Sequence, residues 1–271
     1  QTGGLTSFDS DGYSVGNSGE FNDNSESYVG WNWKANGQGS SNTDGTINTT
    51  YTSANTTSGF SIVKYTGTGA NGTIGHGLGV KPAWIIIKNL SAAEDWLCYH
   101  KSLGATKHIK LNKTEAVGTA TSRFNDTEPT TSVFTVGTDP QTNGSGNNMI
   151  AYCYAEKTGF SKFGSYTGNA NADGVFIYTG FKPAFIILRG TNAENWIMFD
   201  NKRDPINVAD DLILPNQNIA AFSATYLDML SNGFKLRTTA VGGNASGQEF
   251  IYIAFAEAPL VGTNNIPATA R

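Results

Sequence analysis

The pattern of apolar and polar residues along the chain is typical of β-strands, and helical periodicity is almost absent. Residues 60–65 and 134–136 alternate with the period of two expected of a strand with one buried face. Residues 83–87 and 184–188 are continuously apolar, which predicts central strands buried on both faces. Turn-forming residues separate these runs. The pattern therefore predicts an all-β fold of tandem antiparallel β-sandwich modules, jelly-roll-like in character.

Two copies of one sequence pattern follow each other along the chain. Residues 81–88 (KPAWIIIK) match residues 182–189 (KPAFIILR), and the acidic motif that ends at Trp96 matches one that ends at Trp196. The nearly constant spacing of about 100 residues predicts two homologous modules. We call residues 57–157 module 1 and residues 158–258 module 2. In each module the last two strands, such as residues 134–136 and 150–154, are expected to pair as a hairpin around a Gly/Asn loop.

A partial third copy opens the chain. Residues 11–16 resemble residues 132–137, and residues 28–33 resemble residues 149–154. We therefore interpret residues 1–35 as the C-terminal hairpin of an incomplete preceding module, and the chain as a piece of a longer one. Residues 36–56, which contain few apolar side chains, are expected to be a Gly/Ser/Asn/Thr linker. Residues 259–271 are expected to form an extended C-terminal arm.

Composition and charge exclude several classes of function. Charged residues make up 15% of the 271 residues, and the net charge is −4 with 18 scattered basic residues, so no nucleic-acid partner is expected. No apolar run reaches the roughly 18 residues of a membrane helix, so we expect no membrane insertion. Cys98 and Cys153 lie in apolar stretches, which favours two buried free thiols over a disulfide. The histidines are isolated and no metal-ligand spacing occurs, so neither a metal nor a cofactor is expected.

Tryptophans are the first group of candidate site residues. Trp96 and Trp196 occupy the same repeat position, where they could serve as flat platforms for a sugar ring, although a place in the module core is the favoured interpretation. Trp31 and Trp33 alternate on one strand and so share a face. Because their module is incomplete, we expect them to meet a partner surface. Interface positions are also assigned to two prolines of the C-terminal arm, Pro259 and Pro267.

The densest group of charges in the chain lies in module 2. It comprises Asp200, Arg203, Asp204, Asp210 and Asp211. Paired carboxylates could support glycoside hydrolysis, and carboxylate oxygens could bind a cation. Neither a hydrolase motif nor a calcium-loop pattern is present, so a solvated loop with an ion pair is favoured. Asp200, Arg203 and Asp204 nevertheless remain candidate ligand-binding residues. The glycine-rich loop around His76 lacks the lysine and helix of a phosphate loop and is interpreted as a turn.

Several motifs in order along the chain resemble a family of large virion proteins of tailed bacteriophages, common in phages of marine bacteria. They include residues 31–39 (WNWKANGQG), 74–89 (IGHGLGVKPAWIIIKN), 174–190 (GVFIYTGFKPAFIILRG) and 252–259 (YIAFAEAP). The resemblance spans essentially the whole chain. It implies repeated C-terminal modules of a tail fibre or structural protein located on the virion, and it assigns no catalytic residues. By analogy with phage fibres it also implies a homo-oligomer, with a closed trimer expected, and contacts with other virion proteins.

Three functions are consistent with the sequence. The leading hypothesis is a non-enzymatic virion protein that adheres to host-surface glycan through many weak modules, whose repetition raises avidity. The second is a purely structural role as a head-fibre, decoration or baseplate protein. The third is a glycan depolymerase, which would need a carboxylate pair in a cleft.

Overall fold

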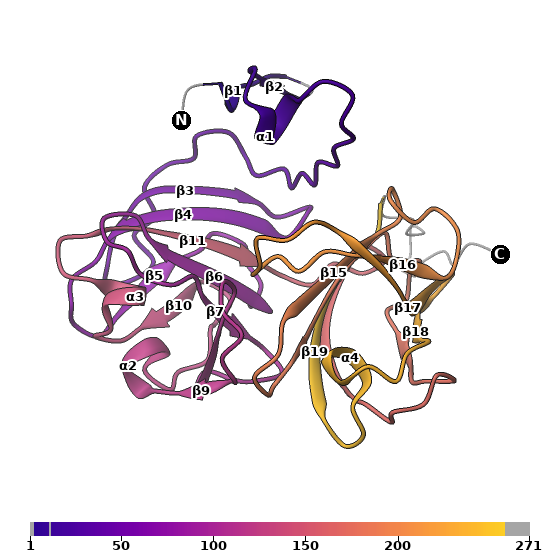
Figure 1. Ribbon diagram of the computed structural model, residues 1–271. Helices are drawn as coiled ribbons and strands as arrows, with labels where there is room; N and C mark the ends of the chain where they lie inside the picture. The colour runs from indigo at the N-terminus through magenta and orange to yellow at the C-terminus, as the bar shows by residue number, and fades with distance from the viewer. Residues whose placement is uncertain (1–2, 11, 258–271) are drawn as a thin grey trace. The chain divides into compact units, whose positions relative to one another are not determined.

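The computed structural model describes residues 3–10 and 12–257 of the chain. The chain divides into two compact units, residues 1–32 and residues 33–271 (Figure 1). Pro259 and Pro267, to which an interface role was assigned, lie outside the described residues. Within the described part, none of the helices has the length and apolar character needed to span a membrane.

The N-terminal unit has the local structure of the end of a module, but not the predicted hairpin. Strand β1 (Leu5–Phe8) pairs with β2 (Tyr13–Val15), and the short helix α1 (Gly19–Asn22) follows. The expected pairing of β2 with residues 28–33 is wrong, because β2 pairs with β1 and residues 28–33 have no strand assignment.

Module 1, together with β3 from the segment that precedes it, is built from two antiparallel sheets. One sheet has seven strands in the order β3-β4-β11-β6-β7-β8-β9, and the other pairs β10 with β5. The elements are β3 (Thr49–Asn55), β4 (Phe60–Thr66), β5 (Gly72–Gly75), β6 (Trp84–Asn89), β7 (Leu97–His100), β8 (Lys107–Lys110), β9 (Gly118–Thr119), α2 (Thr121–Phe124), β10 (Val133–Val136), α3 (Pro140–Asn143) and β11 (Asn148–Tyr154).

Module 2 repeats the central part of this arrangement. One four-stranded sheet has the order β12-β19-β14-β15, and the other has the order β13-β18-β17-β16. The elements are β12 (Ser161–Thr167), β13 (Phe176–Tyr178), β14 (Phe185–Gly190), β15 (Trp196–Asp200), β16 (Ala209–Leu212), β17 (Phe222–Leu230), β18 (Gly233–Leu236), α4 (Val241–Asn244) and β19 (Glu249–Phe255). The antiparallel sheets confirm the predicted all-β, sandwich-type fold.

The two modules share a strand order, which explains the repeat and corrects one prediction. The order β4-β11-β6-β7 in module 1 corresponds to β12-β19-β14-β15 in module 2, and β5-β10 corresponds to β13-β18. The last two strands of each module therefore belong to different sheets. The predicted hairpin of residues 134–136 with residues 150–154 is wrong, because β10 pairs with β5 whereas β11 lies between β4 and β6.

A buried asparagine holds the crossing from one sheet to the other in each module. Asn143 ends α3 with its side chain fully buried, and its Nδ2 donates to the carbonyls of Ala70 (2.6 Å) and Gly137 (2.9 Å). Asn244 ends α4 and donates to the carbonyls of Asn171 (2.9 Å) and Thr238 (2.7 Å). Each bond pairs a backbone carbonyl at the crossing with a buried donor.

An equivalent hydrogen bond from an asparagine side chain identifies the partial third copy. In the N-terminal unit, Nδ2 of Asn22 donates to the carbonyl of Gly16 (3.0 Å) at the end of α1. The spacing of six residues equals that between Asn143 and Gly137 and between Asn244 and Thr238. Helix α1 therefore corresponds to α3 and α4, and residues 28–33 correspond to the central strands β11 and β19.

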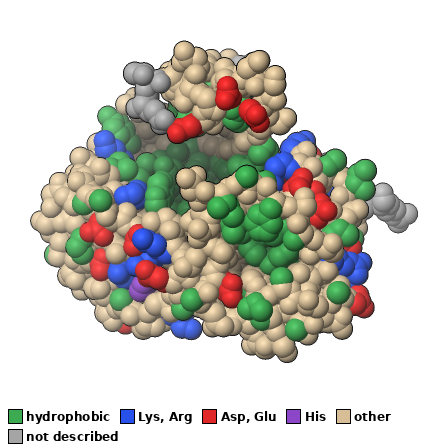
Figure 2. Space-filling model, in the orientation of Figure 1, with side chains coloured by type: hydrophobic (Ala, Val, Ile, Leu, Met, Phe, Trp, Pro, Cys, Tyr) green, Lys and Arg blue, Asp and Glu red, His purple; other side chains and the backbone are tan. Residues whose placement is uncertain are grey.

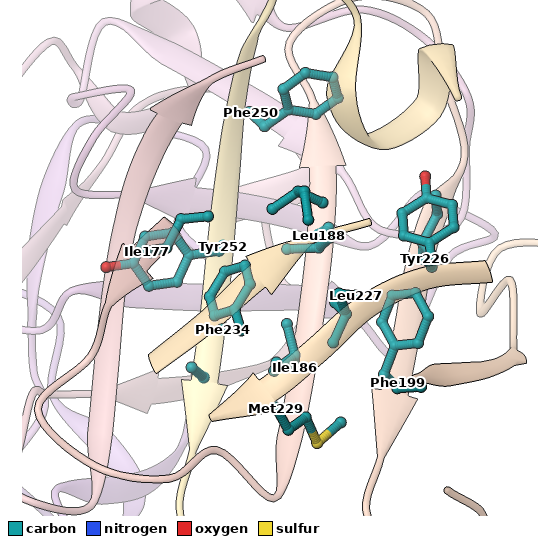
Figure 3. Packing of buried hydrophobic residues seen from close by; sticks show 14 of the residues in the cluster. Ile177, Ile186, Leu188, Phe199, Tyr226, Leu227, Met229, Phe234, Phe250 and Tyr252 are labelled. Carbon is teal, nitrogen blue, oxygen red and sulfur yellow. The ribbon is translucent and has the colours of Figure 1, made fainter. Parts of the chain in front are cut away.

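The apolar residues of each module pack between its two sheets. Figure 3 shows this core in module 2, where Ile186 and Leu188 of β14 face Leu227 of β17 and Phe234 of β18. Alternate residues of β14 point into this core, while Ile187 and Arg189 point to the other face of the sheet and are also buried. The continuous apolar run 184–188 thus reflects a strand that is covered on both faces.

Residues 36–56 are not only a linker. They contain β3, which pairs with β4 from Thr49↔Tyr65 to Asn55↔Phe60, and Ile47, which forms a bridge to Ile74 and is buried in the core of module 1. The sequence did not predict this strand, because its threonine and serine residues give it no alternating apolar face.

Candidate functional site

The outer face of one sheet of module 2 is buried against module 1, and one predicted site residue, Trp196, lies at this interface. Nε1 of Trp196 donates to the carbonyl of Lys110 (2.9 Å), Nη2 of Arg189 donates to the carbonyl of Glu115 (2.6 Å), and the backbone N–H of Val117 donates to the carbonyl of Thr191 (2.9 Å). The segment of module 1 that follows β8 therefore packs on module 2 and is hydrogen-bonded to it. We call this segment the clamp.

Arg189 is fully buried at this interface. Its Nη1 donates to the carbonyls of Gly190 and Asn192 (both 2.9 Å), and its guanidinium carbon lies 5.9 Å from the centroid of the Trp196 ring. Burial lowers the pKa of Arg189 to about 10, so the side chain keeps its charge near neutral pH. Carbonyl oxygens from both modules solvate that charge, which makes the arginine a specific connection between them.

His100 forms a second polar contact between the modules. Its Nδ1 accepts from the backbone N–H of Ser102 (3.2 Å), and its Nε2 donates to the carbonyl of Tyr252 in module 2 (3.3 Å). Burial lowers the pKa of His100 to about 4. The neutral imidazole therefore holds this contact at neutral pH, because protonation would place a hydrogen on Nδ1 facing the N–H of Ser102.

The two equivalent tryptophans have different environments. Trp196 is fully buried, so the prediction that it offers a platform to a sugar is wrong. Trp96 is half-buried and stacks on Tyr152, with ring centroids 6.4 Å apart and an angle of 21° between the planes. Its role as a sugar platform stays a prediction. The difference arises because module 1 covers Trp196 and only part of Trp96.

Asp200 and Arg203 form a structural ion pair. The Asp200 side chain is 2% exposed, its Oδ2 lies 2.7 Å from Nε of Arg203, and its Oδ1 accepts from the backbone N–H groups of Lys202 and Arg203 (both 3.0 Å). Because both oxygens are already engaged, this arrangement does not supply the free, accessible carboxylate that the depolymerase hypothesis required of Asp200.

Asp204 belongs to a separate cluster of carboxylates. Oxygen atoms of Asp204, Asp210 and Asp211 lie within 4.8 Å of one another. Burial, followed by the neighbouring carboxylates of Asp211 and Asp210, raises the pKa of Asp204. Oxygen ligands at this spacing could hold a divalent cation. The structure therefore separates the predicted group into a closed ion pair and an open carboxylate cluster.

A shallow hollow of about 180 Å³ lies beside Asp204 in module 2. Its lining combines a lysine, two asparagines and an aspartate with two apolar residues: Lys182, Asn201, Asn207, Asp204, Pro205 and Met229. Asn207 is fixed by two bonds to the backbone of Met229, because its Nδ2 donates to the carbonyl (3.0 Å) and its Oδ1 accepts from the N–H (2.8 Å). These bonds hold the loop that forms the hollow.

Trp33, one of the two predicted interface tryptophans, meets both modules. Its ring lies 5.3 Å from those of Phe185 and Phe255 in module 2 and 6.2 Å from that of Tyr154 in module 1, all in edge-on geometry. This places Trp33 at a junction within the chain. Trp31 is half-buried, and its assignment to a partner surface stays a prediction.

Charges on the visible surface are mixed. On the face shown in Figure 2, basic and acidic side chains lie together among uncharged ones. In module 1 Lys110 pairs with Asp95 (3.1 Å) and Glu115 (2.8 Å). On this face, therefore, the described residues do not form the continuous basic surface that tracks a nucleic-acid backbone.

Sequence reasoning missed the residues that join the modules. Arg189 and His100 were not candidates, and the segment after β8 gave no signal because it acts through backbone carbonyls. One signal was available, since Lys88 and Arg189 place a cation at the end of a buried strand in both repeats. A charge at such a position needs partners, which points to a built polar contact.

Comparison with known proteins identifies a family without an assigned activity. The sequence matches the family described as "Domain of unknown function (DUF7483)" over residues 1–259, so the chain belongs to this family. No curated protein and no solved structure matches the sequence significantly.

Proposed function

We propose that this chain is a non-enzymatic part of a phage tail fibre or related virion appendage, and that it adheres to glycan on the host surface. Its sequence motifs, which resemble those of large virion proteins, support the virion assignment. The hollow beside Asp204 in module 2 is the observation that carries the adhesion assignment.

The chemistry of the hollow suits a sugar. The ammonium group of Lys182 and the amide of Asn201 can donate to hydroxyl oxygens, and the carboxylate of Asp204 can accept from hydroxyl groups. Pro205 and Met229 add apolar surface for the C–H face of the ring. A pyranose offers both kinds of surface, whereas a purely apolar ligand would leave the polar groups unpaired.

The size of the hollow predicts weak binding. About 180 Å³ is below the roughly 300–1,000 Å³ usual for small-molecule sites, so a single sugar unit at the end or along the side of a polymer fits best. Useful adhesion then requires many copies on one appendage, since linked weak sites bind with higher avidity than any one of them.

Adsorption to host cells and binding to isolated host polysaccharide test the proposal. We expect Lys182→Ala and Asp204→Asn to reduce both. Lys162→Ala, at an exposed lysine of β12, should leave both unchanged and serves as the matched control. Equal binding by all four proteins, wild type included, would refute the assignment of the hollow.

A purely structural role in the virion is the second candidate. The buried contact between the modules favours it, because a rigid pair of modules suits a building element as well as a display element. Failure of the wild-type chain to adsorb to host cells or to block infection would favour this alternative.

A further inference from the structure

The internal repeat makes it possible to compare the same surface in two environments. In module 2, the outward-facing residues Trp196, Ile251 and Ile253 are all fully buried. At this sheet's edge the clamp from module 1 contributes the carbonyls of Lys110 and Glu115. The outer face of this sheet is thus an established contact surface within the chain.

The equivalent surface of module 1 is only partly covered. Trp96, Ile150 and Tyr152 are the repeat counterparts of Trp196, Ile251 and Ile253, and all three are half-buried. Leu90, the counterpart of Thr191, is 55% exposed. We call these four residues the Trp96 face. Its four side chains are largely apolar, and three of their counterparts in module 2 are fully buried on the side where module 1 packs.

The alignment of the two surfaces rests on bonds as well as on sequence. The backbone N–H of Trp96 donates to Oδ1 of Asn112 (3.0 Å), and that of Trp196 donates to Oδ1 of Asn216 (3.0 Å). Both tryptophans therefore occupy the same place in the module, and the two faces can be compared residue by residue.

Three equivalent aromatic residues meet at one point. Trp33, Tyr154 and Phe255 each occupy the last position of the strand pattern shared by residues 28–33, β11 and β19. Their ring centroids are 6.2 Å (Trp33–Tyr154), 5.3 Å (Trp33–Phe255) and 5.9 Å (Tyr154–Phe255) apart. The three rings thus form one mutual contact, to which modules 1 and 2 each contribute one ring.

We propose that the Trp96 face binds a third module of this same repeat. Each module would then clamp the next around the three aromatic residues, as module 1 clamps module 2. The third module would cover Leu90 and Tyr152 with apolar side chains and offer backbone carbonyls to the edge of the sheet beside Trp96.

A second copy of this chain fits the face less well. Its module 2 could approach the Trp96 face, but if each module clamps the next in a ring of three, its module 1 would then occupy the place already taken by module 2 of the first copy. A single third module meets no such clash.

Chemical accessibility of tryptophan tests whether the face is covered. Oxidation by N-bromosuccinimide, mapped by mass spectrometry, is measured on the isolated 271-residue chain and on the natural protein in the assembly that its source produces. We expect Trp96 to react readily in the isolated chain and to lose this reactivity in the natural assembly, becoming as protected as Trp196. Equal reactivity of Trp96 in both samples would overturn the proposal.

Cross-linking then identifies the occupant. A photo-reactive side chain at position Leu90 of the natural protein should cross-link to a module of this repeat outside modules 1 and 2. Cross-links to residues 209–222 of a second copy would mean that a second copy, and not a third module, covers the face, and would overturn the proposal. Mixing isotopically labelled and unlabelled protein detects such cross-links. Capture of a protein of another fold would overturn the proposal as well. Leu90→Asp should restore reactivity of Trp96 in the assembly, and Val80→Asp, at an exposed position outside this face, should not.

Discussion

Replacement of Arg189 by lysine isolates the polar connection between the two modules. The repeat already shows what a lysine does at this position, because Nζ of Lys88 donates to the carbonyls of Asn89 (2.7 Å) and Glu94 (2.9 Å) within its own module. Arg189 makes similar local bonds and one more, to the carbonyl of Glu115 in module 1. Arg189→Lys should keep the local bonds and lose only the bond between modules.

The structure sets the expected magnitude of this loss. A hydrogen bond to a charged group contributes about 1.5–3 kcal/mol, and the bond from Arg189 to Glu115 is short at 2.6 Å. Glu115 is exposed, so water can partly replace the lost donor. We therefore expect a decrease in the free energy of unfolding of about 2 kcal/mol, below the upper limit of that range.

Urea unfolding followed by tryptophan fluorescence measures the effect, because Trp196 lies beside Arg189. With a slope of about 3 kcal/mol per molar urea, a loss of about 2 kcal/mol moves the midpoint down by about 0.7 M. A separate, earlier transition of one module would also agree with a weakened interface. Lys88→Arg is the matched control and should change the stability by less than about 0.5 kcal/mol.

Two results would refute this reasoning. An unchanged midpoint in Arg189→Lys would mean that the bond to Glu115 contributes nothing in solution. Equal losses in Arg189→Lys and Lys88→Arg would mean that the local environment of each cation, rather than the connection between modules, determines the stability.

Three further predictions concern other buried polar groups. Because burial lowers the pKa of His100 to about 4 in the folded chain, against about 6.5 when unfolded, the unfolded state binds the extra proton first as the pH falls; His100 alone should lower the stability by about 2 kcal/mol between pH 7 and pH 5, and His100→Gln should lose that part of the pH dependence in thermal or urea unfolding. Asn143→Ala and Asn244→Ala should each cost about 3 kcal/mol in urea unfolding, since each leaves several buried backbone groups unpaired, and a large loss in only one module would contradict their equivalence. Cys98 and Cys153 are fully buried with their pKa raised to about 12, so a thiol reagent should label neither in the native chain and both after unfolding, and rapid native labelling would contradict the packing.

The sequence predicted where the strands lie in the chain better than which strands pair with each other. Alternation and the repeat located β4, β6 and β11, because burial of side chains leaves a direct trace in residue type. The pairing of β10 with β5 left no such trace, since it depends on how the chain crosses between sheets at Asn143. Strand β3 was missed for a related reason, because its threonine and serine residues satisfy a sheet without an apolar face.

The candidate site was predicted less well than the fold. Trp96 and Trp196 are indistinguishable in the sequence, and only the neighbouring module makes one a buried contact and leaves the other partly open. Asp200 and Asp204 are close in the sequence, yet one forms a closed pair with Arg203 and the other joins a carboxylate cluster. Such differences depend on contacts between distant segments, which a single sequence does not encode locally.

The pairing of first and last strands has a mechanical consequence. In module 1 Phe60, which begins β4, pairs with Tyr154, which ends β11, and in module 2 Ser161 pairs with Phe255 in the same way. In module 2, where no strand precedes β12 in the sheet, the chain therefore enters and leaves at one end of that sheet. A pull on the two ends of module 2 would open this strand pair from that end, one hydrogen bond after another, rather than shear all its bonds together. The aromatic junction of Trp33, Tyr154 and Phe255 lies where these ends meet, so its packing would oppose the first step of that opening.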